Sequence, residues 1–204
     1  MELSRVQTLF DHLYQDVNGH TISLEGRDAH GYEGKSFVYG EVIPESFYEF
    51  MSMTNPRPGE IFYDFGSGTG KAVLLAHLLF EFADCKGIEY VDTLHESAAA
   101  TLAEYERSIR PTIINDVGNR SLSVSLGSFL DRDVNDADVI FMNSTCFQED
   151  LMDALDTKLA TLKPGTRIIT LSKSLKSPIY NLQHHKKYLF GWGEATVFFH
   201  TKSE

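Results

Sequence analysis

The chain has 204 residues, of which 42% are apolar and 23% are charged, and its 18 basic against 29 acidic side chains give a net charge of −11. This balance is typical of a folded globular domain with a sizeable core and argues against extensive disorder. The longest apolar stretch, residues 72–83, is too short for a membrane-spanning helix, which needs about 20 residues.

No sorting signal or metal site is predicted. The amino terminus lacks a basic segment followed by an apolar one, so we expect no signal peptide. Cys85 and Cys146 are too few for a disulfide framework or a zinc site, and the histidines do not form a ligand cluster. We therefore expect a soluble intracellular protein in the cytoplasm, with no metal and no membrane partner.

Charge is unevenly distributed along the chain. Residues 158–202 carry eight lysines and arginines against Glu194 alone, while the rest of the chain is strongly acidic. Phosphate contacts dominate non-specific nucleic-acid affinity, so the acidic body argues against a nucleic-acid partner. The basic segment predicts either scattered solvated lysines or a local face for an acidic partner.

The amino-terminal region predicts two helices joined by a loop. Apolar residues recur at helical spacing over 3–17. Five glycines lie within 18–40, which we expect to be a long loop. A proline then suits the first turn of a helix over 44–53.

The breaker cluster at 55–59, Asn-Pro-Arg-Pro-Gly, predicts a boundary between a helical segment, 1–58, and a second domain, 59–204. Short apolar runs then alternate with helical patterns. The predicted strands are 61–65, 86–90, 122–127, 137–143, 167–171, 186–192 and 194–201. The predicted helices are 70–83, 92–109 and 151–162, the last one preceded by a capping box of Thr145 and Gln148.

This alternation predicts an α/β fold with a mostly parallel sheet covered by helices on both faces. The last two strands are joined tightly at 191–193 and predict an antiparallel hairpin. Ligands bind such sheets beyond the carboxyl ends of the strands. The residues that follow each strand are therefore the candidates for function.

The first strand ends in Asp64-Phe65-Gly66-Ser67-Gly68-Thr69-Gly70. A phosphate-binding P-loop needs a glycine where Phe65 stands and a hydroxyl where Ala72 stands. A dinucleotide loop needs a third glycine where Lys71 stands. An acid followed by Gly-x-Gly-x-Gly, the loop of S-adenosylmethionine (SAM) enzymes, matches at every position. The alternative interpretation is a tight turn with no ligand.

Candidate ligand-binding residues follow the next three strands. Glu89 ends the second strand, where a carboxylate accepts hydrogen bonds from a ribose diol. Ser128 and Phe129 follow the third, where the ring either stacks on adenine or packs inward. Asn143 follows the fourth, close to where a transferred methyl group should lie, or else it only forms a turn.

These residues resemble the disruptor-of-telomeric-silencing type of histone-lysine methyltransferase, which has no SET domain. Tyr39-Gly40-Glu41 is similar to the family's lid motif, residues 64–70 to its cofactor loop, and 139–143 to the strand whose asparagine lines the lysine channel. Phe147, residues 162–169, Trp192 and residues 199–201 extend the similarity, which covers about 39–201.

The resemblance implies a Rossmann-like class I methyltransferase fold with a seven-stranded sheet, SAM as cofactor, and a protein lysine as acceptor, with a histone as one candidate. In that case the protein would be nuclear. It implies cofactor contacts from Tyr39, Gly40, Glu41, Asp64, Gly66, Ser67, Gly68, Thr69, Gly70, Lys71, Glu89, Ser128, Phe129 and Asn143. It implies a catalytic lysine channel lined by Asn143, Phe147, Trp192 and Phe199.

The sequence departs from the family at several positions. Ser128 replaces an adenine-binding acid, Ser144 replaces a second asparagine, and the channel tyrosine has no clear match near 197–199. The family's long basic extension is not present in this acidic chain. Two alternatives therefore stay open: a SAM-dependent methyltransferase acting on RNA or a small molecule, and a SAM-binding module without catalysis.

Overall fold

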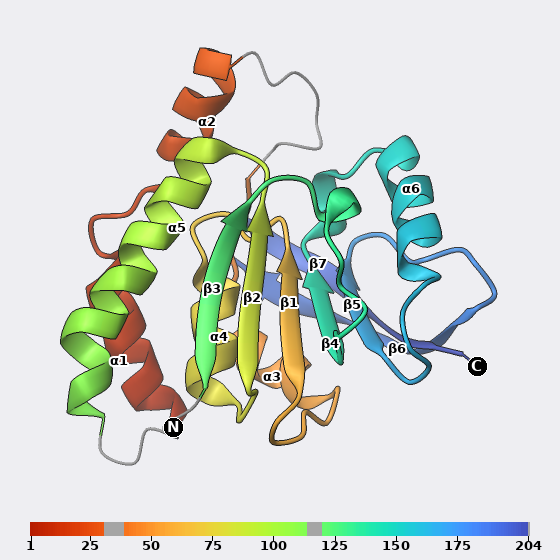
Figure 1. Cartoon of the computed structure of the whole chain (residues 1–204), viewed down its shortest axis with the longest axis horizontal. Helices are drawn as coiled ribbons and strands as arrows, with labels where there is room; N and C mark the ends of the chain where they lie inside the picture. The colour runs from red at the N-terminus through yellow and green to blue at the C-terminus, as the bar shows by residue number, and fades with distance from the viewer. Residues whose placement is uncertain (31–38, 114–119, 204) are drawn as a thin grey trace.

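The computed structural model describes residues 1–30, 39–113 and 120–203. Its seven strands form one sheet in the order β3-β2-β1-β4-β5-β7-β6 (Figure 1). All neighbours are parallel except β7, which runs antiparallel to both β5 and β6. The strands are β1 (Ile61–Phe65), β2 (Asp84–Glu89), β3 (Ser121–Leu126), β4 (Val139–Met142), β5 (Arg167–Leu171), β6 (Tyr180–Phe190) and β7 (Gly193–Lys202).

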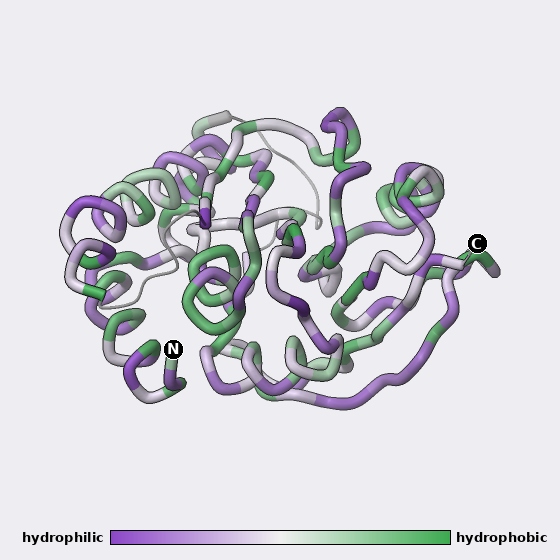
Figure 2. Tube along the Cα trace, turned by 60° about the horizontal axis from the view of Figure 1, so that its bottom comes forward, coloured by the Kyte–Doolittle hydropathy of each residue, from purple (hydrophilic) through white to green (hydrophobic). Residues whose placement is uncertain are grey.

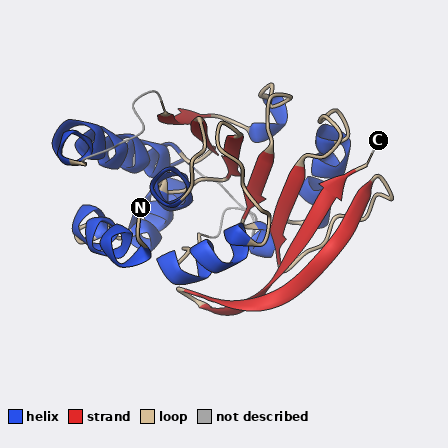
Figure 3. Ribbon diagram, turned by 90° about the horizontal axis from the view of Figure 1, so that it is seen from below, coloured by secondary structure: helices blue, strands red, loops and turns tan. Residues whose placement is uncertain are grey.

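The α-helices are α1 (Leu3–Tyr14), α2 (Gly19–His30), α3 (Pro44–Ser52), α4 (Lys71–Leu79), α5 (Asp92–Glu104) and α6 (Glu149–Leu159). A π-helical turn, Tyr105–Ile109, continues α5 to the end predicted for that helix. The most hydrophobic segments, green in Figure 2, lie mainly inside the molecule. The long β6–β7 hairpin curves along one side (Figure 3). None of the helices in the described ranges is both long and apolar enough to span a bilayer.

Two apolar layers lie on opposite faces of the sheet because successive side chains of a strand alternate between faces. Phe62 and Phe141 pack with α1, α3 and α4 in one layer. Tyr63 and Ile140, their sequence neighbours, pack with α6 in the other. The central strands β1, β4 and β5 are buried on both faces, which explains their continuous apolar runs. The structure confirms the predicted α/β class, the mostly parallel sheet and the carboxyl-terminal hairpin. The division at residue 58 stays a prediction.

The predicted loop over 18–40 is wrong for its first half, because Gly19–His30 forms α2; residues 31–38 lie outside the described ranges. The glycines of α2 allow close packing. A Cβ at Gly26 would lie 2.0 Å from Oγ1 of Thr93 on α5, so glycine lets the two helices approach.

The predicted capping box before α6 is also wrong. Thr145 lies in a 3₁₀ turn, Ser144–Cys146, and its Oγ1 is 3.0 Å from Oγ of Ser172. Helix α6 begins after Gln148, whose side chain makes no capping bond.

Strand β6 begins at Tyr180, six residues before its predicted start at 186. Its first half is an exposed edge with polar side chains, so it has no apolar run to mark it.

A buried histidine on β7 makes stability depend on pH. His200 is 2% exposed, and its Nε2 lies 2.9 Å from the Ser174 hydroxyl and accepts from the Leu175 amide at 3.3 Å. Its Nδ1 faces the Ile168 carbonyl at 3.4 Å. These partners suit a neutral ring, and burial lowers the pKa of His200 to about 4.

Because the pKa of His200 is lower in the folded chain than in the unfolded chain, its stabilisation is complete above pH ~6.5 and is lost as pH falls toward 4. Between pH 6.5 and pH 4, protonation of His200 should lower the unfolding free energy of the wild type by about 3 kcal/mol. A His200→Gln variant keeps an acceptor for the Leu175 amide but has no proton to gain, so it should not show this part of the loss. Urea unfolding at several pH values measures the difference, and equal pH slopes would contradict it. The buried carboxyl groups contribute the same pH dependence to both proteins, so their contribution cancels in the difference between the two unfolding free energies.

Candidate functional site

The loop after β1, residues 66–70, turns back over strand β2. Its first two amides donate to the Ile88 carbonyl at 2.8 and 3.1 Å. Gly68 has a φ of +54°, and a Cβ there would lie 2.4 Å from Cε2 of Tyr39. Position 68 therefore needs glycine both for its backbone and for the close approach of the Tyr39 ring.

Two buried carboxyl groups flank this loop. Glu89 accepts hydrogen bonds from the amides of Gly68 at 2.7 Å and Val91 at 2.8 Å. Asp64 is 3% exposed, and burial raises its pKa well above the usual range, with a further increase from the negative charge of Glu89. Burial also raises the pKa of Glu89. This electrostatic environment favours a ligand that brings positive charge or hydroxyl donors.

A cavity of about 220 Å³ opens beside the loop at the carboxyl edge of the sheet. Eight of the predicted residues line it: Tyr39, Gly40, Gly66, Glu89, Ser128, Phe129, Asn143 and Phe147.

Four further lining residues were not predicted: Tyr90, Val91, Leu94 and Leu151. The first two follow β2 directly, so the rule that ligands bind beyond strand ends would have found them. The two leucines lie in the first turns of α5 and α6, and their helical spacing indicated only core packing.

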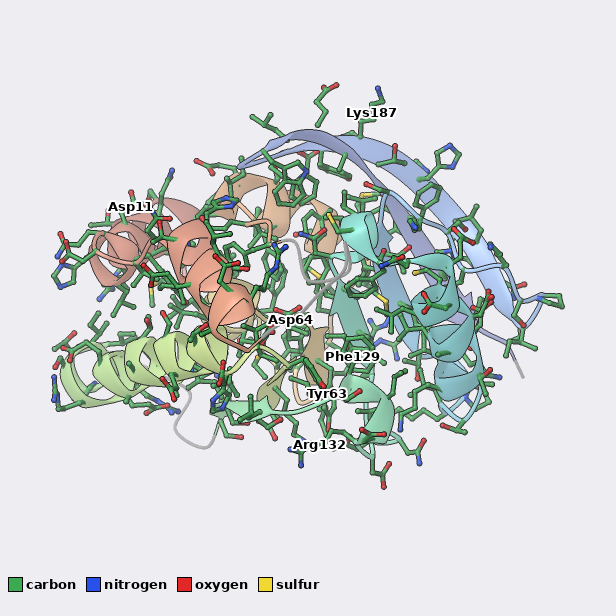
Figure 4. The ribbon with its side chains drawn as sticks, turned by 90° about the horizontal axis from the view of Figure 1, so that it is seen from above. Asp11, Tyr63, Asp64, Phe129, Arg132 and Lys187 are labelled. Carbon is green, nitrogen blue, oxygen red and sulfur yellow. The ribbon has the colours of Figure 1, made fainter. Side chains whose placement is uncertain are left out.

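An aromatic stack forms one wall of this cavity. The Phe129 ring lies 5.1 Å from the Phe65 ring at an interplanar angle of 4°, and 5.9 Å from the Phe147 ring at 28°. Ser128 accepts a hydrogen bond from the Leu130 amide at 3.1 Å, and this bond fixes the turn that carries Phe129. Figure 4, seen from the carboxyl edge of the sheet, shows Asp64 and Phe129 near the centre of the molecule.

A segment beginning at Tyr39 joins the loop to β4 and the β6–β7 hairpin. The Tyr39 hydroxyl lies 2.8 Å from Oγ1 of Thr69. Asn143 Nδ2 donates to the Gly40 carbonyl at 3.3 Å, and a Cβ at Gly40 would lie 2.8 Å from the Trp192 ring. Residues that lie about 100 or more positions apart along the chain therefore meet at one place.

Asn143 lies at the carboxyl edge of the sheet, at its topological switch point. It follows β4, which neighbours β1 at the point where the strand order reverses, the usual ligand position in such sheets. Its Oδ1 is buried and has no partner within the described residues. Asn143 also lines a second, smaller cavity of about 30 Å³ with Asp64, Glu41 and Lys71. The amide oxygen is therefore a free acceptor between two cavities.

Comparison with known proteins identifies the family. The model of the family described as "Histone methylation protein DOT1" matches residues 19–190. The chain belongs to this family. This confirms the resemblance inferred from the sequence motifs.

The DOT1-family chain is 33% identical over 153 residues to the "Histone-lysine N-methyltransferase, H3 lysine-79 specific" of Eremothecium gossypii, covering 72% of this chain and 26% of that protein. It is 28% identical over 190 residues to the protein of the same name from Debaryomyces hansenii, covering 89% of this chain and 15% of that protein. The chain thus spans about a quarter or less of these relatives.

Solved structures place the DOT1-family chain in the class I methyltransferase fold. TrmN from Thermus thermophilus has a TM-score of 0.62 at 19% identity, covering 82% of this chain and 51% of that one. Geranyl diphosphate C-methyltransferase from Streptomyces coelicolor, in complex with S-adenosyl-L-homocysteine, has a TM-score of 0.56 at 12% identity, covering 78% and 79%. At these identities the likeness shows the fold, which confirms the predicted Rossmann-like class.

Two of the residues assigned to the channel from the DOT1-family resemblance, Phe199 and Trp192, line neither of the two cavities. Phe199 is 6% exposed, pairs with Ile169 in the middle of β5 and β7, and stacks on His184 with ring centroids 5.9 Å apart. Trp192, at the tip of the hairpin, is the aromatic residue that reaches Gly40.

Most lysines and arginines of the basic carboxyl-terminal segment form ion pairs with aspartate or glutamate side chains of the same chain. Six of its eight lysines and arginines lie in ion pairs: Lys163, Arg167, Lys173, Lys176, Lys186 and Lys187. Lys158 donates to the Arg132 carbonyl and Lys202 to the Ser203 carbonyl. Lys187 lies on the outer hairpin, far from the cavity (Figure 4). Most of these cations are therefore paired within the chain, and the local face for an acidic partner stays a prediction.

Proposed function

We propose that the chain is a SAM-dependent protein-lysine N-methyltransferase. One observation carries the proposal: within the part of the chain that matches the DOT1 family, Gly66 at the start of the loop, Glu89 and Asn143 line one cavity. The relatives that share this family are named for histone H3 lysine 79, so we propose a histone lysine as acceptor and the nucleus as the site of action.

The residues around the cavity fit SAM, which supplies a methyl group already activated by its sulfonium. Glu89 has lone pairs left to accept hydrogen bonds from the ribose hydroxyls. Phe129 offers a ring face to the adenine, and the Ser128 hydroxyl can donate to its edge. Glu41 and Asp64 are the acids of the smaller cavity, and an ammonium group at the other end of the cofactor would favour the ionised form of Asp64, which burial disfavours.

The acceptor side has different chemistry. A lysine has a pKa of ~10.4, and its amine must lose a proton before it can attack. Apolar walls disfavour the ammonium form. Phe147, which lines the cavity with Asn143, and Trp192, which lies beside Gly40, are the aromatic residues that could supply such walls. The free Oδ1 of Asn143 then accepts a hydrogen bond from the amine and aligns it. Such alignment can contribute up to about 7–11 kcal/mol to lowering the barrier.

A two-step experiment tests the proposal. Calorimetric titration should show that the protein binds SAM, and absence of heat or of a thermal shift at millimolar SAM would overturn the proposal. The protein and labelled SAM are then incubated in three separate reactions, one with nucleosomes, one with RNA and one with metabolite extract. We expect protease-sensitive label on histone lysines. Label on RNA or a small molecule would replace the acceptor class, and binding without transfer would indicate a non-catalytic module.

A further inference from the structure

The chain turns sharply at Ser172, directly after β5. Within the described ranges, Ser172 and Asn55 are the two non-glycine residues with a positive φ, +62° and +49°. Asparagine tolerates this left-handed backbone, whereas serine seldom adopts it, because its Cβ crowds the following carbonyl. The amide of Lys173 donates to the carbonyl of Leu171 at 2.7 Å, which closes a three-residue γ-turn of the strained kind with Ser172 at its centre.

Neighbouring groups hold the turn in this conformation. The Ser172 amide donates to the Thr196 carbonyl of β7 at 2.7 Å. The hydroxyl of Thr170, a fully buried residue, donates to the Lys173 carbonyl at 2.6 Å. Strained backbone persists only where the surrounding structure fixes it in this way, and it is concentrated at functional sites. The turn is thus fixed from two sides, and its strain indicates a role.

Hydrogen bonds tie the turn to the loop that follows β4. Strands β4 and β5 are parallel neighbours, so the segments that follow them leave the same edge of the sheet (Figure 1). Oγ of Ser144, which is fully buried, donates to the Leu171 carbonyl at 2.8 Å and accepts from the Leu171 amide at 3.2 Å. Oγ of Ser172 lies 3.0 Å from Oγ1 of Thr145.

The same loop carries two residues of the proposed acceptor site. Asn143 and Phe147 both line the larger cavity, one directly before the tied residues and the other shortly after them. Nζ of Lys173 donates to the Phe147 carbonyl, so the turn holds the loop near both of them. A relaxed backbone at Ser172 would redirect its own side chain and that of Lys173, and their contacts with the loop would be lost.

We propose that Ser172 is a positioning residue for methyl transfer: its left-handed turn fixes residues 143–147, so that the Asn143 amide keeps its place against the acceptor amine. This inference rests on the proposed function. Glycine would adopt the same backbone without strain, so what serine adds at this position is its hydroxyl, whose partner is Thr145. The loss of that hydrogen bond should therefore show in the rate of transfer.

A Ser172→Gly variant separates positioning from stability. We expect its single-turnover rate of methyl transfer from labelled SAM to nucleosomes to fall about 10-fold, the effect of losing one hydrogen bond in the reacting arrangement. Its affinity for SAM should be unchanged, because the cofactor loop is untouched. Its unfolding temperature should stay close to that of the wild type, because relief of strain offsets the lost contact. Ser172→Asn tolerates the left-handed backbone and can still bond Thr145, so it should recover most of the rate.

Two further variants serve as controls. Thr145→Val removes the other half of the hydrogen bond, so we expect it to lower the rate as much as Ser172→Gly does, and we expect the double variant to be no slower than either. Asn55→Gly relaxes the other positive φ at a residue that lines neither the larger nor the smaller cavity, and it should transfer methyl groups at the wild-type rate.

Transfer rates and calorimetry with SAM together decide the outcome. A wild-type rate in Ser172→Gly, or losses in the two single variants that multiply in the double variant, would overturn the inference and leave the proposed function standing. Equal losses of SAM affinity and rate would assign the turn to cofactor binding and overturn the inference as well. If the wild type binds SAM but methylates no histone, the proposed function fails, and the inference fails with it.

Discussion

Replacing Gly68 by arginine is expected to abolish SAM binding, with a loss of affinity greater than about 100-fold. The backbone at Gly68 has a φ of +54°, and its amide donates to Glu89. A Cβ at this position would meet the Tyr39 ring at 2.4 Å, so the side chain would displace either the ring or the loop. Calorimetric titration with SAM measures the loss.

Gly59 offers a matched control for this substitution. It has a φ of +84°, and a Cβ there would have nothing within 4 Å. Gly59→Arg therefore carries a similar backbone cost, roughly 1–2 kcal/mol, without a clash at the cavity. We expect this variant to be less stable than the wild type and to bind SAM normally. Tight binding by Gly68→Arg would refute the assignment of the loop, whereas weakened binding by both variants would attribute the loss to strain.

The central part of the fold was predictable because burial and sequence pattern agree there. The strand Ile61–Phe65 is packed on both faces, so it must be apolar throughout, and its apolar run identified it. The same topology brings the residues after parallel strands to one edge, which is why Glu89 and Asn143 line a common cavity as expected.

Helix α2, the position of Phe199 and the Lys71–Glu41 ion pair could not be predicted, because they depend on contacts between residues that are distant in the sequence. The glycines of α2 look like loop formers until Thr93 is seen packed against Gly26. Phe199 carries a motif resemblance, yet its strand register directs it into the core. The pairing of Lys71 with Glu41 joins residues 30 positions apart, and neither residue's neighbours in the sequence indicate it.

Removing the Asn143 side chain is expected to lower the rate of methyl transfer by about 100- to 1,000-fold, a loss similar to removal of a preorganised polar group at other reacting centres. The free Oδ1 is the acceptor proposed to align the amine, and alanine leaves no acceptor in its place. SAM affinity should change much less, because the cofactor loop and Glu89 are untouched. Single-turnover transfer rates with labelled SAM, alongside calorimetry, separate the two effects. Equal losses of affinity and rate would assign Asn143 to cofactor binding alone.

An Asn143→Asp variant distinguishes alignment of the amine from the mere presence of an acceptor. Aspartate keeps the shape and the acceptor, but its negative charge favours the ammonium form and raises the pKa of the bound lysine. At neutral pH more of the lysine would then stay protonated and unreactive, so transfer should be slow and should recover as pH rises. The wild-type amide aligns the nitrogen without placing a full negative charge beside it, so it favours the ammonium form much less than a carboxylate does. A pH–rate profile of Asn143→Asp that coincides with the wild-type profile would show that the acceptor nitrogen does not lie against residue 143.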